Sequence, residues 1–533
     1  MKNTAAFIFL SFCVGFLSAQ NHYERFQSID IQHYDFKIYL NDTTNQIEGD
    51  ATVTAKFLKP SNHITLDLAQ KINSTLTGME VSEVIYQNQP VSFTQKNDQI
   101  EINLGKLITE NQVIEFEVKY AGIPDDGLII SENKFGDRTF FADNWPNRAH
   151  HWIPTIDHPS DKATLDFQVF APERYQVISN GILIEETNVA PGWKYTHWKE
   201  KTPISTKIMV IGVARFAVLN YGEVNQIPVS SWVFPQNRLE GFLDYAVSTG
   251  VMEFFTGLIG PYCYEKLAHV QSKTKYGGME NASCIFYAEN SVTGRNNQYS
   301  LIAHETSHQW FGNSVTEQNW HHIWLSEGFA TYLEHIYMRE KFGEEIFRES
   351  LKADRKEVIK YADKRFAPII DTTVTNYSTL LNANSYEKSA WFLHMLNEEL
   401  GDSLFFSGLR LFYLIYRDST VLTSDFQKVI ETVSGRDFSN FFYQWLYQPG
   451  FPQLNFEWKQ NRKNHLAVKF KQIQPQYLFD FPVEIEIVFE DGNRETKELM
   501  IDSREKEFWF KMNQKVEAIN IDPNIKLLFE QLQ

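Results

Sequence analysis

Apolar and polar residues alternate along the first part of the chain, from about residue 30 to residue 215. Clear examples are residues 34–40, 64–68 and 114–120, where every second position is Tyr, Phe, Ile, Leu or Val. A period of two places successive side chains on opposite faces of a strand, so the pattern is typical of half-buried β-strands. We therefore expect a sheet-rich first domain.

The pattern changes to a helical period near residue 236, and segments such as residues 386–400 then carry broad apolar faces. After the Pro-Gly pair at 449–450 the alternation returns, for example in residues 466–470 and 483–489. The middle third is thus predicted to be mainly helical, and a small β domain is predicted to end the sequence.

These patterns predict an α+β fold with several domains. A chain of 533 residues exceeds what one hydrophobic core usually supports, so more than one domain is expected. We place a β domain at residues 20–215, a mainly helical domain at 216–448 and a β-sandwich-like domain at 449–533.

Residues 1–19 have the three parts of a secretory signal peptide: a basic start at Lys2, an apolar run and a small-residue end. A lipid anchor at Cys13 fits less well, because the bulky Phe12 precedes it. No later stretch is long and apolar enough to form a transmembrane segment. We expect an exported protein, periplasmic or extracellular.

Charge and cysteine content narrow the function further. The formal net charge is -17, and no strong basic run is present, so a nucleic-acid partner is not expected. Outside the predicted signal peptide only Cys263 and Cys284 remain, which are too few for a disulfide scaffold. One bridge between them and two free thiols both stay open, and the oligomeric state is not indicated.

A pair of histidines indicates a metal site. His304 and His308 lie four residues apart in a helical context, so both imidazoles project from one face of a helix. Zinc suits neutral imidazole and carboxylate ligands and leaves a fourth position for water. Glu305 follows the first histidine and would lie beside that water. Because such a pattern also occurs by chance and in structural helices, a third ligand is needed.

Glu327 is the candidate third ligand. It lies in the predicted helix 324–334, among apolar residues that mark a buried side. A buried carboxylate is costly unless it is paired or binds a metal. The alternative is a surface cap or ion pair. Glu334, two turns further on, would suit a group that orients a ligand histidine, but a solvated acid is the favoured interpretation.

His304-Glu305-x-x-His308, followed after eighteen residues by Glu327 in the run Trp-Leu-Ser-Glu-Gly-Phe-Ala, resembles the M1 family of zinc aminopeptidases. These gluzincins include leukotriene A4 hydrolase and aminopeptidase N. The resemblance implies one zinc ion per chain. It also implies a saddle-like N-terminal sheet domain followed by a thermolysin-like catalytic domain. The end of the chain departs from the family pattern, because many relatives carry a long helical domain after a β-sandwich, whereas about ninety residues that are predicted to form a small β-sandwich remain here.

A second motif agrees with the first. Residues 277–281, Gly-Gly-Met-Glu-Asn, resemble the family's Gly-x-Met-Glu-Asn signature. The resemblance implies that Glu280 binds the free α-amine of a peptide and that the glycine-rich strand pairs with its backbone. It also places Tyr276 at the pocket for the first side chain. The substrate-binding residues implied in this way are Tyr276, Gly277, Gly278, Met279, Glu280 and Asn281.

A third segment, Tyr386-Glu387-Lys388-Ser389-Ala390, is similar to the family's Tyr-Glu-Lys-Gly-Ala. The resemblance implies that Tyr386 stabilises the oxyanion, although Ser389 stands where glycine is usual. The alternative is a core tyrosine at the start of a helix, and Tyr377 is a weaker candidate for the same role.

One position departs from the family pattern. Members usually add a second amine-binding Glu or Gln from the first domain, and the corresponding place here is Asp143-Asn144-Trp145. Trp145 falls at the simplest register, and the sequence does not decide among the three.

Together the motifs predict a zinc-dependent aminopeptidase with Glu305 as general base and Tyr386 as oxyanion donor. Its partners would be peptides with a free N-terminus. The alternatives are a zinc endopeptidase of the same clan, more remotely an epoxide hydrolase, and an inactive peptide-binding relative.

Overall fold

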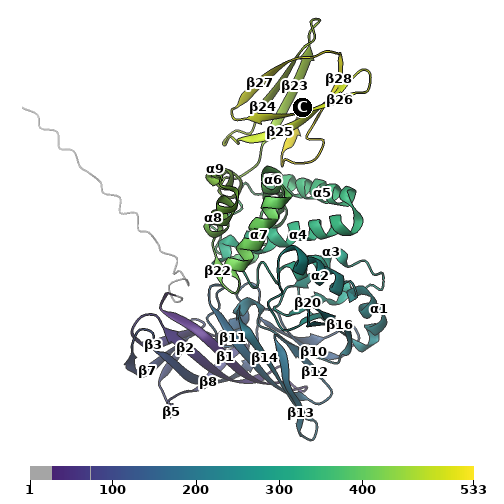
Figure 1. Cartoon of the computed structure of the whole chain (residues 1–533). Helices are drawn as coiled ribbons and strands as arrows, with labels where there is room; N and C mark the ends of the chain where they lie inside the picture. The colour runs from purple at the N-terminus through teal and green to yellow at the C-terminus, as the bar shows by residue number, and fades with distance from the viewer. Residues whose placement is uncertain (1–26, 73, 533) are drawn as a thin grey trace, which may run out of the picture.

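A computed structural model describes residues 27–72 and 74–532. The predicted signal peptide at residues 1–19 lies outside this range. Sheets gather at the N-terminal end of the molecule, helices occupy its middle, and a separate pair of small sheets forms the other end (Figure 1). The predicted fold class is confirmed.

The N-terminal sheets follow from the alternating pattern. In β1 (Ile29–Tyr39), Tyr34, Phe36 and Ile38 are buried, as the period of two predicts. Only β1 and β11 pair in parallel within the largest sheet. The order of that sheet is β13 (Ile182–Ala190), β14 (Trp193–Ser205), β11 (Lys162–Pro172), β1, β2 (Ile47–Phe57), β8 (Val113–Ile123), β4 (Gly78–Tyr86) and β5 (Gln89–Pro90).

Two smaller sheets complete this region. The first lies against the large sheet at the N-terminal end of the molecule. The second lies on the side of this region that is nearer to the helices (Figure 1). Their strands are, in order, β3 (Ser61–Asp67), β7 (Gln99–Ile108) and β6 (Phe93–Lys96), then β12 (Gln176–Ser179), β15 (Ile211–Ala214), β10 (Arg138–Ala142) and β9 (Leu128–Glu132).

The middle third begins with a sheet that the helical pattern did not predict. Its strands are β16 (Ala217–Val224), β17 (Ile227–Val233), β18 (Leu267–Ser272), β20 (Cys284–Ala288) and β19 (Gly278–Met279), in that order. All six residues of β18 are buried, so the strand shows no alternation from which a period could be read. The short edge strand β19 presents the glycine-rich segment to one side of the sheet.

Helices make up most of the rest of the middle third, together with a two-stranded sheet of β21 (Thr316–Glu317) and β22 (Thr420–Val421). The long helix α4 is the central one, because every residue from Trp324 to Leu333 is buried. α3 packs directly against it. The helices are α1 (Arg238–Tyr245), α2 (Ser248–Leu258), α3 (Tyr299–Ser307), α4 (Trp324–Phe342), α5 (Glu344–Ala362), α6 (Ser389–Leu400), α7 (Asp402–Tyr416), α8 (Thr423–Ser434) and α9 (Ser439–Phe442).

The C-terminal strands form two sheets, as the alternation of apolar and polar residues in this part of the sequence predicts. Arg355 Nη2 donates to Asp522 Oδ2 at 2.8 Å and so ties α5 to this region. One sheet contains β27 (Glu505–Lys511), β24 (His465–Gln472), β23 (Gln453–Gln460) and β29 (Glu530–Leu532), and the other contains β26 (Arg494–Ile501), β25 (Phe481–Phe489) and β28 (Val516–Ile521).

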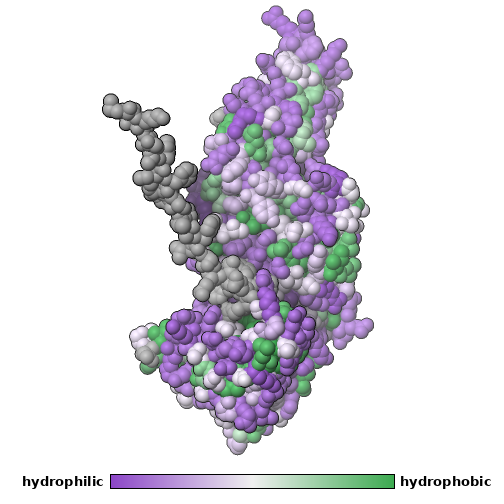
Figure 2. Space-filling view, turned by 90° about the vertical axis from the view of Figure 1, so that its left-hand side faces the viewer, coloured by the Kyte–Doolittle hydropathy of each residue, from purple (hydrophilic) through white to green (hydrophobic). Residues whose placement is uncertain are grey.

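No helix within the described ranges has the length and apolar character needed to cross a bilayer. One face of the molecule is covered mostly by hydrophilic residues, with apolar ones in small scattered groups (Figure 2).

Cys263 and Cys284 are both free thiols, so the two residues that the sequence left as either a disulfide or two thiols are not bridged.

Candidate metal centre and peptide-binding cavity

Three side chains from α3 and α4 converge on one point. His304 lies in the last turn of α3 and His308 just beyond its end, so both rings leave the same side of the helix. Glu327 lies in the first turn of α4. The two histidine Nε2 atoms are 3.2 Å apart, and they lie 3.6 and 3.3 Å from Glu327 Oε2.

This donor set fits zinc. Zinc–nitrogen and zinc–oxygen bonds of about 2.0–2.1 Å in a tetrahedron place neighbouring donors about 3.3 Å apart. The three observed separations, between 3.2 and 3.6 Å, bracket that value. Within the described part of the chain, these three residues are the one group of His, Cys, Asp and Glu side chains that meets the geometry of a metal site.

The outward-facing nitrogens of both histidines are held by neighbours. His304 Nδ1 lies 3.2 Å from Glu334 Oε2, and Ser300 donates to the same carboxylate. His308 Nδ1 lies 3.0 Å from Ser326 Oγ. Such contacts fix the ring orientation and leave Nε2 for a metal. The favoured interpretation of Glu334 as a solvated acid was therefore wrong; the sequence spacing of two helical turns could have indicated its contact with α3.

The protonation of the three donors is strongly coupled. Burial opposes the charge of His304, but its contacts with Glu327 and Glu334 raise its pKa well above the ordinary value. Burial likewise favours protonated Glu327, yet the charge of His308 and contacts with both imidazoles lower the pKa of this carboxyl. In the absence of metal, the site therefore favours protonated imidazoles around a carboxylate, and these protons must leave when a cation binds.

Glu305 lies against the glycine-rich strand β19. A Cβ on Gly278 would overlap the Glu305 carboxyl group, so any larger residue at this position of the motif would displace that side chain. Burial raises the pKa of Glu305 to about 7, with the charges of His304 and His308 acting in the opposite direction. This carboxyl group lines the same cavity as the three metal donors.

These groups share a cavity of about 50 Å³. Nine of the eleven site residues that the motifs singled out line it, and the other two, Gly277 and Asn281, do not. Leu381 also lines the cavity and carried no sequence signal. The lining residues are Trp145, Tyr276, Gly278, Met279, Glu280, His304, Glu305, His308, Glu327, Leu381 and Tyr386.

Glu280 brings a carboxyl group with an unpaired oxygen to the cavity. Glu280 is 5% exposed, and its Oε1 atom has no hydrogen-bond partner among the described residues. Its backbone carbonyl is fixed, because Gln309 Nε2 and Asn313 Nδ2 donate to it at 2.7 and 2.6 Å. A buried carboxylate oxygen without a partner is costly. The position is therefore suited to a cationic group of a ligand.

Tyr386 faces the same space from the short π-helical turn Asn384–Lys388 that precedes α6. Its ring lies parallel to that of His304, with centroids 6.0 Å apart. Burial and the nearby carboxylates raise its pKa well above the ordinary value, so the phenol keeps its proton and can donate. Ser389 is accommodated because its hydroxyl donates to Asn384 O at 2.7 Å. Tyr377 packs against Trp320 and does not line the cavity.

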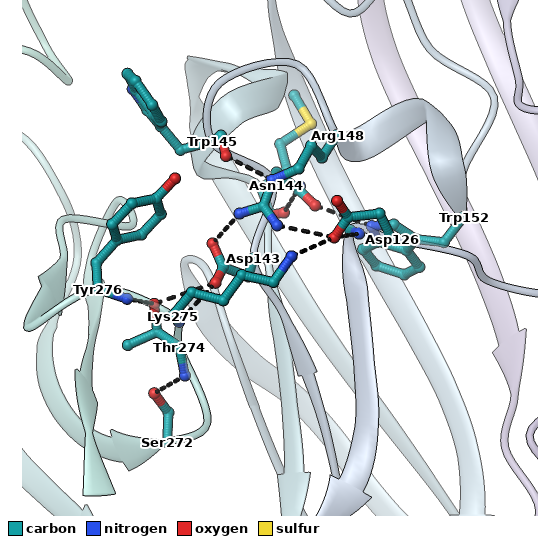
Figure 3. A network of polar contacts seen from close by, with 12 residues as sticks. Asp126, Asp143, Asn144, Trp145, Arg148, Trp152, Ser272, Thr274, Lys275 and Tyr276 are labelled. Atoms are coloured by element: carbon teal, nitrogen blue, oxygen red, sulfur yellow. Dashed lines mark hydrogen bonds and ion pairs between the residues drawn. The ribbon is translucent and has the colours of Figure 1, made fainter. Parts of the chain in front are cut away.

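The side chains of residues 143–145 point in two directions: Trp145 lines the cavity, whereas Asp143 and Asn144 point into the interior. Figure 3 shows the indole of Trp145 pointing away from a polar network into which Asp143 and Asn144 point. Asp143 Oδ1 accepts a hydrogen bond from Arg148 Nη2 at 2.6 Å. Asn144 Nδ2 donates to the carbonyls of Thr206 and Met209. Of the three candidates for the second amine-binding position, only Trp145 lines the cavity.

Comparisons with known proteins indicate one family. The model of the peptidase M1 N-terminal domain matches residues 30–208, and that of the peptidase family M1 domain matches residues 244–445. A probable aminopeptidase 2 of Sulfurisphaera tokodaii is 26% identical over 412 residues, which cover 74% of this chain and 51% of the relative. A glutamyl aminopeptidase of Sus scrofa is 25% identical over 463 residues, which cover 80% of this chain and 48% of the relative.

A solved structure shares the fold. A crystal structure of an M1 zinc metallopeptidase mutant from Deinococcus radiodurans superposes with a TM-score of 0.69 at 21% identity, over 80% of this chain and 96% of the other. The chain spans about half the length of the two curated relatives.

Proposed function

This chain belongs to the M1 peptidase family, and we propose that it is a zinc-dependent aminopeptidase that hydrolyses the N-terminal bond of peptides. The observation that carries the proposal is the position of Glu280. This buried carboxylate with an unpaired oxygen lines the same small cavity as the three metal donors. A charge-assisted contact to a free α-amine would hold the first peptide bond next to the metal position.

His304, His308 and Glu327 would hold one zinc ion per chain. Bound zinc supplies positive charge that polarises a carbonyl and makes water more acidic. Glu305 takes a proton from the attacking water and passes it to the leaving amine. Tyr386 donates its phenolic proton in a hydrogen bond to the developing oxyanion, since its raised pKa keeps that proton in place. Glu280 restricts cleavage to the first peptide bond by anchoring the ammonium group.

Two other functions are disfavoured by particular residues. A zinc endopeptidase would have no use for the buried Glu280 carboxyl group, whose Oε1 is unpaired in the cavity. An inactive peptide-binding relative typically loses a ligand or the base, whereas the three donors and Glu305 are all present.

We also propose that the protein is exported, on the basis of the signal-peptide pattern at residues 1–19. Its site of action would then be the periplasm or the extracellular space. Detection of a mature form that lacks these residues, by mass spectrometry of the purified native protein, tests this proposal.

The function is tested with matched pairs of chromogenic aminoacyl substrates, one member with a free amine and one N-acetylated. We expect release from the free-amine members only, loss of release with a chelator, and recovery when zinc but not magnesium is added back. Cleavage of the acetylated members would indicate an endopeptidase. A zinc-loaded protein that cleaves neither member would favour the peptide-binding alternative.

A further inference from the structure

We infer that Gln309 and Asn313 are positioning residues that set the distance between the metal centre and the Glu280 carboxyl group. The inference rests on the proposed function, in which Glu280 holds the α-amine of a substrate whose first peptide bond lies next to the metal position. Cleavage at that bond requires a fixed separation between the two, because a misplacement of about 1 Å can cost roughly 100-fold in rate.

Both positioning residues are attached to the backbone at the metal donor His308. Gln309 is the next residue in the chain. Asn313 returns to the same place in the turn after α3, where its backbone N–H donates to His308 O at 3.0 Å. Both residues are fully buried, so water is not an alternative partner for their amide groups. Each amide is thus held directly by the segment that carries the donor.

Both amides donate to the same backbone oxygen. Gln309 Nε2 and Asn313 Nδ2 lie 2.7 and 2.6 Å from the carbonyl oxygen of Glu280. A carbonyl oxygen has two lone pairs, so these two donors use its full capacity. The Oε1 atom of the Glu280 side chain has no partner among the described residues, so no hydrogen bond to that atom helps to place the carboxyl group.

Gln309 also holds the segment that follows Glu280. Its Oε1 accepts a hydrogen bond from the backbone N–H of Ser283 at 2.9 Å. Ser283 has a φ of 59°, in the left-handed region that residues other than glycine rarely adopt. Such a backbone persists only where its surroundings hold it, and Gly181 N and Lys266 Nζ also donate to Ser283 Oγ. One glutamine therefore ties both ends of residues 280–283 to the metal donor.

The alternative is that the two amides only stabilise the fold, and Gln472 provides a matched control for it. This glutamine is also fully buried, and it lies in the C-terminal domain. Its Nε2 donates to the carbonyls of Phe479 and Ser503 at 2.8 and 3.2 Å, and its Oε1 accepts from Phe479 N at 3.0 Å. Gln472→Leu therefore removes the same kind of contacts without a change near Glu280.

The test compares two inhibitors of the zinc-loaded protein: leucine hydroxamate, and 4-methylpentanohydroxamic acid, which is the same molecule without the α-amine. Both carry the same metal-binding group, so the ratio of their Ki values measures the contribution of the amine alone. We expect the preference for the amine to fall by roughly 10-fold in Gln309→Leu and in Asn313→Ala. The Ki of the compound without the amine and the zinc content should equal those of the wild type.

Two controls separate positioning from stability. Gln472→Leu should lower Tm as Gln309→Leu does, because each leaves buried polar groups unpaired, but it should leave the Ki ratio unchanged. In Glu280→Gln the anchoring charge is absent, so the further change Gln309→Leu should not alter the ratio any more. This non-additivity is expected only if Gln309 acts through Glu280.

An unchanged Ki ratio in both Gln309→Leu and Asn313→Ala would overturn the inference. Equal weakening of the two inhibitors would overturn it as well, because the two amides would then support the metal centre or the whole fold. Failure of the proposed function gives a different result, in which the wild type binds both inhibitors equally and cleaves no free-amine substrate; the inference would fall with it.

Discussion

The metal centre and the proposed amine-binding part of the cavity, which we call the amine end, are built in different ways. His304, His308 and Glu327 come from two helices that pack against each other, and each donor leaves its helix near one end. The amine end joins segments that are 131 residues apart, where Thr274 and Lys275 meet Asp143 across the N-terminal sheets and the middle region. Local helical geometry therefore determines the first site, whereas tertiary packing determines the second.

The largest effect is expected when the metal centre is broken. His308→Ala removes one of three donors, so zinc content should fall to near zero and activity toward every substrate should drop below detection. Metal analysis and turnover of free-amine substrates measure this. His63→Ala, a histidine in β3 far from the cavity, serves as the control. A His308→Ala protein that keeps stoichiometric zinc would contradict the assignment.

A smaller and more selective loss is expected at the amine end. Glu280→Gln keeps the shape of the side chain but removes its charge, so kcat/KM for free-amine substrates should fall by roughly 10- to 100-fold. Zinc content should be unchanged, since Glu280 is not a donor. Glu498→Gln, which changes an exposed carboxylate of β26, is the matched control. A loss of zinc from Glu280→Gln as large as that from His308→Ala would contradict the separation of the metal centre from the amine end.

Glu334 tests how the metal centre is supported. Glu334→Gln removes the carboxylate that lies against His304 Nδ1, so zinc affinity should fall by roughly 10- to 100-fold while the zinc-saturated enzyme keeps most of its activity. Competition with a chromogenic chelator measures the affinity. The solvated-acid interpretation would instead give an affinity equal to that of the wild type.

The smallest effect on activity is expected at Lys388, two residues after Tyr386. The Lys388 side chain is buried, its Nζ has no hydrogen-bond partner among the described residues, and burial lowers its pKa to about 7 from an ordinary 10.5. The unfolded chain thus binds a proton between pH 7 and 10.5 that the folded chain does not, so this group makes stability rise with pH across that window, by at most about 1.4 kcal/mol per pH unit.

Lys388→Met should therefore flatten the rise in Tm between pH 7 and 10 and raise Tm at pH 7. Thermal unfolding followed by circular dichroism at several pH values measures both. Identical pH profiles for the wild type and the variant would show that Lys388 titrates normally in the folded state.

The same comparison explains what the sequence could predict. The alternation in residues 34–40 and the spacing of His304 and His308 report local geometry, and the structure places both as expected. The fully buried strand β18 has no period to read, so the sheet at the start of the middle third was missed. The roles of residues 143–145 depend on Arg148 and on distant partners such as Thr206 and Thr274, which no local pattern reveals.

The central claim is that Glu305 is the base beside a zinc held by three other residues. The most direct test measures zinc content and turnover of Glu305→Gln together with the wild type. We predict one zinc per chain in both proteins, and a loss of roughly 100- to 10,000-fold in kcat for the variant. A Glu305→Gln protein that turns over free-amine substrates at the wild-type rate would contradict the account.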